Sequence, residues 1–147
     1  MSHYAFAHIA HLFCAILFIG VVFFEVVLLE RVRKNLPEET MHHFEIALIN
    51  QAKRIMPWVV GTLFLTGLLM AWVHRAALSK PSSSAFGLLL SIKIVLAFSV
   101  LAHFVTAIRS ASNGCMTSGR FMRTHLSVAA HMVLIVILAK AMFYIRW

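Results

Sequence analysis

The sequence predicts an all-α integral membrane protein, a bundle of four transmembrane helices that forms a single domain over residues 1–147. Hydrophobic residues make up 61% of the chain and charged residues 12%, whereas roughly 25% of the residues in a typical soluble protein are charged. A chain of this size cannot bury so much apolar surface in water. The composition therefore excludes a soluble enzyme, a secreted disulfide scaffold and a disordered tail.

Four apolar stretches reach the length of about 20 residues that crossing a bilayer requires. They cover residues 4–29, 56–73, 86–108 and 126–145. No proline interrupts their interiors, and Pro57 stands at the start of the second stretch, where its missing N–H group costs least. The first stretch has no Lys or Arg before it and is too long for a cleavable signal, so we expect it to remain as a span.

Basic residues predict which way the bundle is inserted. The loops after the first and third stretches hold eight Lys and Arg residues, namely Arg31, Arg33, Lys34, Lys53, Arg54, Arg109, Arg120 and Arg123. The opposite side holds three, namely Arg75, Lys80 and Arg146. Because Lys and Arg concentrate in cytoplasmic loops, we expect both termini outside and both larger loops on the inner side of a bacterial inner membrane. The same asymmetry accounts for the net charge of +8 without a nucleic-acid partner.

The first inner loop has the pattern of a helix. Pro37 is followed by Glu38 and Glu39, and acidic residues in a first turn favour the N-terminal dipole of a helix. Apolar residues then recur at helical spacing, namely Phe44, Ala47, Leu48 and Ile55. We predict an amphipathic helix that lies along the inner surface and runs into the second span.

The most informative residues are the ionisable ones within the predicted spans. Each costs a few kcal/mol at bilayer depth, and such residues usually line a functional interior. The set consists of His8, His11, Glu25, His74, Lys93, His103, His125, His131 and Lys140. Lys140 stands apart, because a helical wheel turns it away from His131 and lets it extend towards the surface.

His103 and His131 are predicted to lie at one depth. At a rise of about 1.5 Å per residue they are about 9 Å and 12 Å from the inner face, on sequential antiparallel helices. Two facing imidazoles at one level are what a six-coordinate haem iron requires. The pattern therefore predicts a haem b site, and two neutral histidines bonded to backbone carbonyls or to each other are the alternative. Glu25 lies at a similar level, either as a proton carrier or as a structural partner of a Lys or His.

The outer half holds residues that would suit a copper ion. His8, His11, Cys14, Met70 and His74 supply imidazole, thiol and thioether groups, which copper accepts. No tight Met-x-Met or His-x-His run accompanies them. Copper binding by this set is the alternative to haem binding.

Four segments of the chain resemble, in order, the membrane proteins of the CopD-like and HemJ-like superfamily. The similar segments are His11-Leu-Phe-Cys-Ala-Ile-Leu-Phe-Ile-Gly20, Lys53-Arg54-Ile-Met56-Pro57-Trp-Val-Val-Gly61, Leu90-Ser-Ile-Lys93 with His103 ten residues on, and Arg123 and His125 with the Leu138-Ala-Lys140 end. The resemblance implies a four-helix membrane protein. It also implies His11 as an iron ligand, with Arg54 and Lys93 as partners for propionates or substrate carboxylates. HemJ-like proteins bind b-type haem and oxidise protoporphyrinogen IX, whereas CopD-like proteins are linked to copper uptake or resistance.

These observations together predict a membrane redox protein with one or two haem b groups. His103 and His131 are the expected inner ligands and His11 the expected outer one, and Glu25 and Lys93 are the candidate catalytic residues. The expected partners are membrane lipid and a quinone or a porphyrinogen. A copper-uptake protein and a structural subunit without a cofactor are the alternatives. The sequence leaves open whether the protein is an enzyme or a passive electron carrier, and whether it forms a homodimer.

Overall fold

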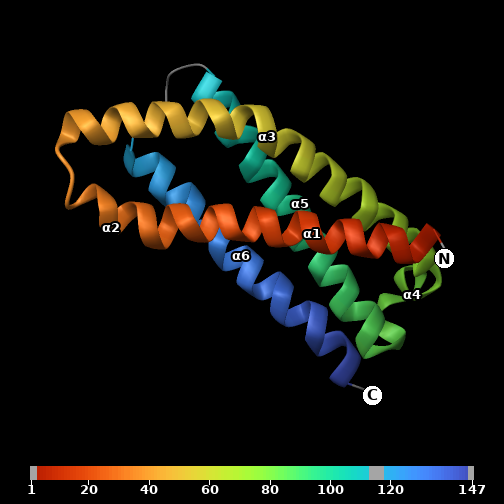
Figure 1. Ribbon diagram of the computed structural model, residues 1–147. Helices are drawn as coiled ribbons and strands as arrows, with labels where there is room; N and C mark the ends of the chain where they lie inside the picture. The colour runs from red at the N-terminus through yellow and green to blue at the C-terminus, as the bar shows by residue number, and fades with distance from the viewer. Residues whose placement is uncertain (1–2, 113–117, 146–147) are drawn as a thin grey trace.

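The computed structural model describes residues 3–112 and 118–145, and in this part of the chain every regular element is helical. Along the chain the elements are α1 (His3–Phe23), the π-helical η1 (Phe24–Leu29), α2 (Glu30–Arg33), α3 (Glu38–Val73), α4 (Arg75–Ser79), the 3-10 helix η2 (Pro81–Ser83), α5 (Ala85–Ser112) and α6 (Ser118–Tyr144). Figure 1 shows their course from the N-terminus to the C-terminus. Cys115, which the sequence places in the second inner loop, lies outside the described residues.

Four helical stretches are long and apolar enough to cross a membrane, which confirms the four predicted spans. They are His3–Arg33, Glu38–Val73, Ala85–Ser110 and Arg123–Tyr144. All four are longer than the apolar stretches of the sequence, because the helices continue into polar flanking residues. The 36 residues of α3 extend over about 54 Å, well beyond the roughly 30 Å of a hydrocarbon core.

The helix predicted after Pro37 is present and runs into the second span, as expected. It is the first part of α3, which begins at Glu38 and continues without a break to Val73. Glu38 and Glu39 occupy its first turn, as expected. Pro57 consequently lies inside a helix and not at the start of one. The helix tolerates this proline at the cost of one backbone hydrogen bond.

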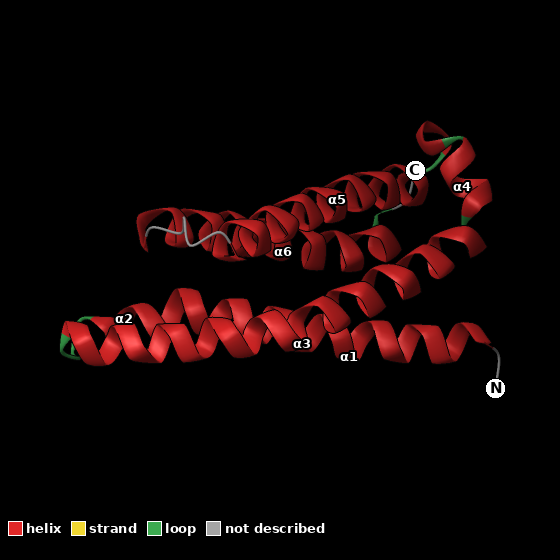
Figure 2. Ribbon diagram, turned by 90° about the horizontal axis from the view of Figure 1, so that it is seen from above, coloured by secondary structure: helices red, strands yellow, loops and turns green. Residues whose placement is uncertain are grey.

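The four long helices form two hairpins, α1 with α3 and α5 with α6 (Figure 1). Seen from above, α1 and α3 form one layer and α5 and α6 the other, with α3 rising towards α4 at its end (Figure 2). The start of α1, α4 and the end of α6 lie together at one end of the bundle, which we call the terminal end. The turn between α2 and α3 lies at the opposite end, which we call the turn end.

One apolar core joins the two layers near the middle of the bundle. Its buried residues come from all four helices, namely Phe18, Val22, Val60, Val100, Val128 and Met132. The rings of Phe18 and Phe104 meet edge to face with their centroids 6.1 Å apart, a favourable arrangement for aromatic pairs. We call the six buried residues the apolar core.

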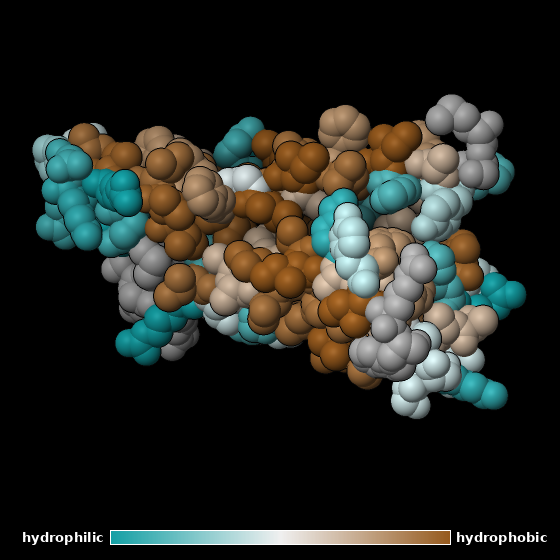
Figure 3. Space-filling model, turned by 90° about the horizontal axis from the view of Figure 1, so that it is seen from below, coloured by the Kyte–Doolittle hydropathy of each residue, from teal (hydrophilic) through white to brown (hydrophobic). Residues whose placement is uncertain are grey.

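The exterior of the bundle is largely apolar. Many large side chains are exposed, among them Phe6, Trp58, Trp72 and Phe143. Apolar residues cover most of the middle of the face seen from below, and hydrophilic residues gather at the turn end (Figure 3). A surface of this kind is unfavourable in water and suits contact with lipid.

The connection between α3 and α5 is itself ordered. It contains α4 and η2, and both pack against the start of α5. Ser84 precedes α5, and its hydroxyl accepts the backbone N–H of Gly87 at 3.1 Å, the usual role of a serine that caps a helix. A β-carbon added at Gly87 would stand only 2.8 Å from the carbonyl oxygen of Ala77. Glycine is therefore required here by the close approach of two backbones.

Candidate functional site

The ring planes of His103 on α5 and His131 on α6 lie side by side inside the second hairpin. Their centroids are 5.6 Å apart and the planes are tilted by 48°. Both side chains are half-buried. The juxtaposition that was predicted from depth alone is therefore confirmed.

A serine lies four residues before each of these histidines, and the four side chains form one reciprocal arrangement. The His103 Nδ1–H group donates to the backbone carbonyl of Ser99 at 2.8 Å, and the His131 Nδ1–H group donates to that of Ser127 at 2.8 Å. Each Nε2 atom meets the serine of the opposite helix, with His131 Nε2 at 3.2 Å from Ser99 Oγ and His103 Nε2 at 3.4 Å from Ser127 Oγ. We call these four residues the Ser-His quartet.

The quartet fixes the tautomer of both rings. A carbonyl oxygen only accepts hydrogen bonds, so each Nδ1 must carry its proton. In the neutral rings each Nε2 then has a free lone pair, which accepts the serine hydroxyl. This is the arrangement in which histidine binds metals, with one nitrogen oriented by a hydrogen bond and the other available as the ligand atom.

Glu25 is not part of the quartet, and its partner is His125 of α6. Glu25 Oε2 lies 2.8 Å from His125 Nε2. Glu25 is only 8% exposed and lies in η1, the π-helical segment that follows α1. Short π-helical segments inside α-helices occur frequently at functional sites. The contact of Glu25 with a histidine is confirmed, and its role as a proton carrier stays a prediction.

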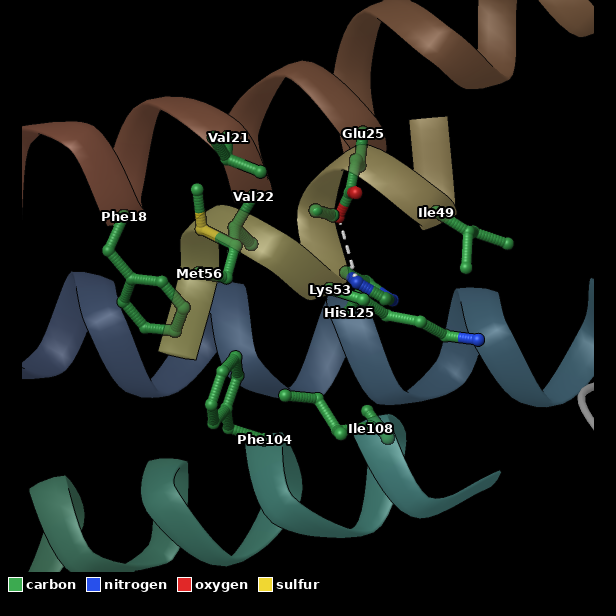
Figure 4. Close-up of a pocket in the computed structure, with 12 residues that line it drawn as sticks. Phe18, Val21, Val22, Glu25, Ile49, Lys53, Met56, Phe104, Ile108 and His125 are labelled. Atoms are coloured by element: carbon green, nitrogen blue, oxygen red, sulfur yellow. Dashed lines mark ion pairs between the residues drawn. The ribbon is translucent and has the colours of Figure 1, made fainter. Parts of the chain in front are cut away.

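A pocket of about 100 Å³ adjoins the Glu25–His125 pair (Figure 4). Lys53 of α3 also lines it, and the remaining walls are apolar side chains from α1, α3 and α5, such as Phe18, Met56 and Phe104. Figure 4 shows the Glu25 and His125 side chains pointing towards each other, with Lys53 beside His125. We call Glu25, His125 and Lys53 the inner polar cluster.

His11 lies in the half of the bundle nearer the terminal end. Its Nδ1–H group donates to the carbonyl oxygen of Leu63 at 2.9 Å and lies 3.2 Å from the hydroxyl of Thr66. His11 also packs against Gly67, where an added β-carbon would meet the ring at 3.2 Å. Lys93 is half-buried and close enough for its charge to act on the His11 ring.

The remaining predicted site residues are dispersed. His74 meets the Tyr4 hydroxyl at 3.4 Å, and Tyr4 also contacts the exposed His8. Cys14 is half-buried with a free thiol, and Met70 is half-buried on α3. Within residues 3–112 and 118–145, no group of three or more His, Cys, Asp or Glu side chains is close enough to hold a metal ion. His8, Cys14 and His74 are thus not gathered into one ligand set.

The two basic residues of the second span differ in position. Arg54, the predicted partner of propionates, is exposed, whereas the adjacent Lys53 lines the pocket. Lys140 is exposed, as its place on the helical wheel suggested.

The sequence analysis missed the roles of Lys53, His125 and the two serines. Their signals are present in the printed sequence. On α3, Lys53 precedes Met56, Val60 and Leu63 at alternating steps of three and four, which is the spacing of a helix face that packs against others. On α6, His125 precedes Val128 and Met132 in the same way. The repeated Ser-x3-His spacing at 99–103 and 127–131 is the signal for the quartet.

Comparison with known proteins adds no relative. No protein-family model matches the chain. No curated protein and no solved structure matches it either. Function is therefore argued from the side chains described above.

Proposed function

We propose that this chain is a multi-pass membrane protein that binds haem b between His103 and His131 and carries electrons within the bilayer. The observation that supports the proposal is the Ser-His quartet. It brings two imidazoles to one level on neighbouring helices and leaves an Nε2 lone pair on each. Two imidazoles are the ligands of a six-coordinate haem iron.

The residues around the pair suit such a centre. Both Nδ1–H groups are anchored on backbone carbonyls, which orients each ring and increases its basicity as a ligand. The two Nε2 atoms hold no stronger partner than a serine hydroxyl, and an iron ion would replace those contacts. Val100, Val128 and Met132 of the apolar core lie on the same two helices and keep this part of the bundle dry. A dry, low-dielectric surround is one of the means by which proteins set a haem potential.

The haem iron supplies one-electron redox chemistry when it is bound. The chain contributes the axial ligands and the exclusion of water. We assign to His11 the role of a second ligand near the terminal end, because its Nδ1–H is anchored in the same way on the Leu63 carbonyl. Lys93, half-buried on α5, is the cation that would pair with a propionate or a substrate carboxylate. Arg54 would serve this role only from the surface.

The proposal includes an orientation and a partner. The turn end faces the cytoplasm of a bacterial inner membrane, because the loops near it carry most of the Lys and Arg residues. A quinone or a porphyrinogen dissolved in the bilayer would exchange electrons with the site. A cysteine introduced at Ser82, in η2, should then react with a membrane-impermeant maleimide added to intact spheroplasts, whereas one introduced at Glu39 should react only after lysis.

Copper binding is the second candidate, and one observation favours it. Imidazole Nε2 atoms suit copper as well as iron, and the quartet presents two of them without a third protein ligand among the described residues. The metal that copurifies with the protein distinguishes the two candidates.

The deciding experiment is a visible absorption spectrum of the detergent-purified protein, oxidised and then reduced with dithionite, with iron and copper quantified in the same sample. We expect a Soret band that shifts on reduction, with resolved α and β bands. His103→Ala and His131→Ala should each abolish this low-spin spectrum. His43→Ala, at an exposed position of α3, is the matched control and should leave it unchanged.

A colourless protein from haem-replete cells would contradict the haem proposal. If that protein carried copper that His103→Ala removed, the second candidate would replace the first. If it carried neither metal, the quartet would serve helix packing alone.

A further inference from the structure

The inner polar cluster is separate from the Ser-His quartet and has chemistry of its own. We propose that Glu25 and His125 form a proton-binding site that exchanges its proton with the aqueous phase at the turn end through the pocket beside Lys53. This inference does not depend on haem or copper binding.

The Glu25 carboxylate occupies a buried position on a helix face that is otherwise apolar. Phe18, Val22, Glu25 and Leu29 follow one another at steps of four, three and four, and all four are buried. Glu25 thus belongs to the face of α1 and η1 that packs into the bundle. An ionised carboxylate at such a place needs a compensating group, and the structure supplies His125 at 2.8 Å.

The contact between Glu25 and His125 can form in two protonation states that differ by one proton. With a neutral imidazole, the Nε2–H group donates to the carboxylate and the pair carries one negative charge. When a proton from water is added at Nδ1, the imidazolium still donates through Nε2–H and the pair is neutral. The same neutral pair also exists as a carboxylic acid that donates to Nε2. Proton uptake therefore needs no rearrangement of the two side chains, and it removes a net charge from a low-dielectric site.

The charged and titratable side chains that line the pocket come from three elements. Glu25 comes from η1, His125 from α6 and Lys53 from α3, whereas α5 contributes Phe104, Ala107 and Ile108 to the pocket. Lys53 is the cation among the residues that line the pocket. Two ligating groups beside a lysine do not suit a metal ion, and the pair belongs to no larger ligand group among the described residues.

The pocket provides space for water between the pair and the turn end. The pocket of about 100 Å³ has room for several water molecules, each of which needs roughly 10–15 Å³ of such volume. Its lining reaches from Phe18 and Met56, at the apolar core, to Ile49 and Lys53, which lie towards the turn end. In the opposite direction Phe18 and Val22 of the apolar core separate the pair from His11. Exchange is therefore directed to the turn end.

Infrared spectroscopy tests the proposal directly, because the chain holds only five acidic residues, all of them glutamates, and only Glu25 lies in a predicted span. Difference spectra of the vesicle-reconstituted protein are recorded as the pH is changed. We expect carboxyl and imidazole bands that shift in H/D exchange and are lost in Glu25→Gln. Glu38→Gln, at the exposed start of α3, should retain them.

The access path is tested by filling the pocket. Ala107→Leu should slow H/D exchange of these bands several-fold, because the added atoms occupy the space for water. Ala102→Leu, at an exposed position of the same helix, is the matched control and should leave the rate unchanged. If the wild-type bands were identical to those of Glu25→Gln at every pH, the site would bind no proton and the proposal would fail. If Ala107→Leu and Ala102→Leu exchanged at the wild-type rate, the assigned path would be wrong.

If Glu25→Gln fails to fold, isotope labelling of the wild-type protein still tests whether Glu25 binds a proton. Protein labelled with ¹³C at the glutamate carboxyls shifts all carboxyl bands and identifies them as glutamate. A band from a glutamate that exchanges slowly and lies in an apolar environment would support the proposal. Labelled bands that all report solvent-exposed carboxylates would overturn it.

Discussion

His103 on α5 and His131 on α6 make equivalent contacts at the interface between these two helices, which we call the seam. Each donates its Nδ1–H to the carbonyl of the serine one helical turn before it, and each presents Nε2 to the serine of the other helix. Because α5 and α6 are antiparallel, the same four-residue spacing on both helices brings all four groups to one level. The seam is therefore fixed in register by polar contacts as well as by apolar packing.

The register contacts should have a measurable effect on stability. Ser99→Ala and Ser127→Ala each remove the hydroxyl that an Nε2 atom accepts, so each should destabilise the protein by about 1 kcal/mol. The measurement is reversible unfolding in mixed micelles followed by circular dichroism. Ser91→Ala is the control, because its hydroxyl donates to the carbonyl of Gly87 within the same helix at 2.8 Å. An equal loss in the control would show that the quartet adds nothing to the seam.

Gly87 should be the most sensitive of the four glycines whose surroundings the structure describes, namely Gly20, Gly61, Gly67 and Gly87. Gly87→Ala forces a β-carbon against the Ala77 carbonyl and should cost about 1–3 kcal/mol, as overpacking does elsewhere. Gly61→Ala meets no atom within 4 Å and should be neutral or slightly stabilising, since alanine favours a helix. Thermal unfolding in detergent compares the two variants. A Gly87→Ala protein as stable as Gly61→Ala would contradict the close approach of α4 to α5.

The ion pair that joins α2 to α3 should contribute little. Arg33 and Glu45 are in contact, with Nη2 to Oε1 at 2.5 Å, but about a quarter of each side chain is exposed. Pairs of this kind usually contribute less than about 1 kcal/mol and are weakened by salt. A double-mutant cycle with Arg33→Gln and Glu45→Gln should give a coupling below that value, lower still at high salt. A larger, salt-independent coupling would mean that the pair is far better shielded than its exposure indicates.

Trp58 and Trp72 should report the boundaries of the bilayer. They are 79% and 70% exposed and lie about 21 Å apart along α3, near the two ends of its apolar part. Tryptophan favours the interfaces of a membrane. In single-tryptophan variants, brominated lipids should quench both residues, and bromine close to the headgroups should quench more than bromine at the chain ends. An absence of quenching would be incompatible with a membrane-spanning α3.

Features that depend on one helix at a time could be predicted from the sequence. Apolar length identified the four spans, because no other arrangement satisfies the backbone of such segments in a bilayer. The constant rise of a helix was enough to bring His103 and His131 to one level. Both predictions use distances along a single axis.

Features that depend on how the helices are ordered around the bundle were missed. Glu25 lies at a depth similar to that of His103, yet it pairs with His125, because α1 packs against α6 on that side. Depth alone favours His103, because His125 is only two residues, or about 3 Å, past Arg123. The fate of Pro57 was misjudged for a related reason. Its place before an apolar stretch resembles a helix start, but packing against α1 keeps α3 helical through it.

The two-layer arrangement bears on how the protein is made. Each hairpin already satisfies its own backbone and pairs two apolar helices, so each is a unit that can enter the bilayer by itself. The two units then associate through the apolar core, which draws residues from both. A gene divided within the connection between α3 and α5 would therefore encode two fragments, each with two spans. Co-expression of such fragments would let the assembly of the mature bundle be followed separately from the insertion of its halves.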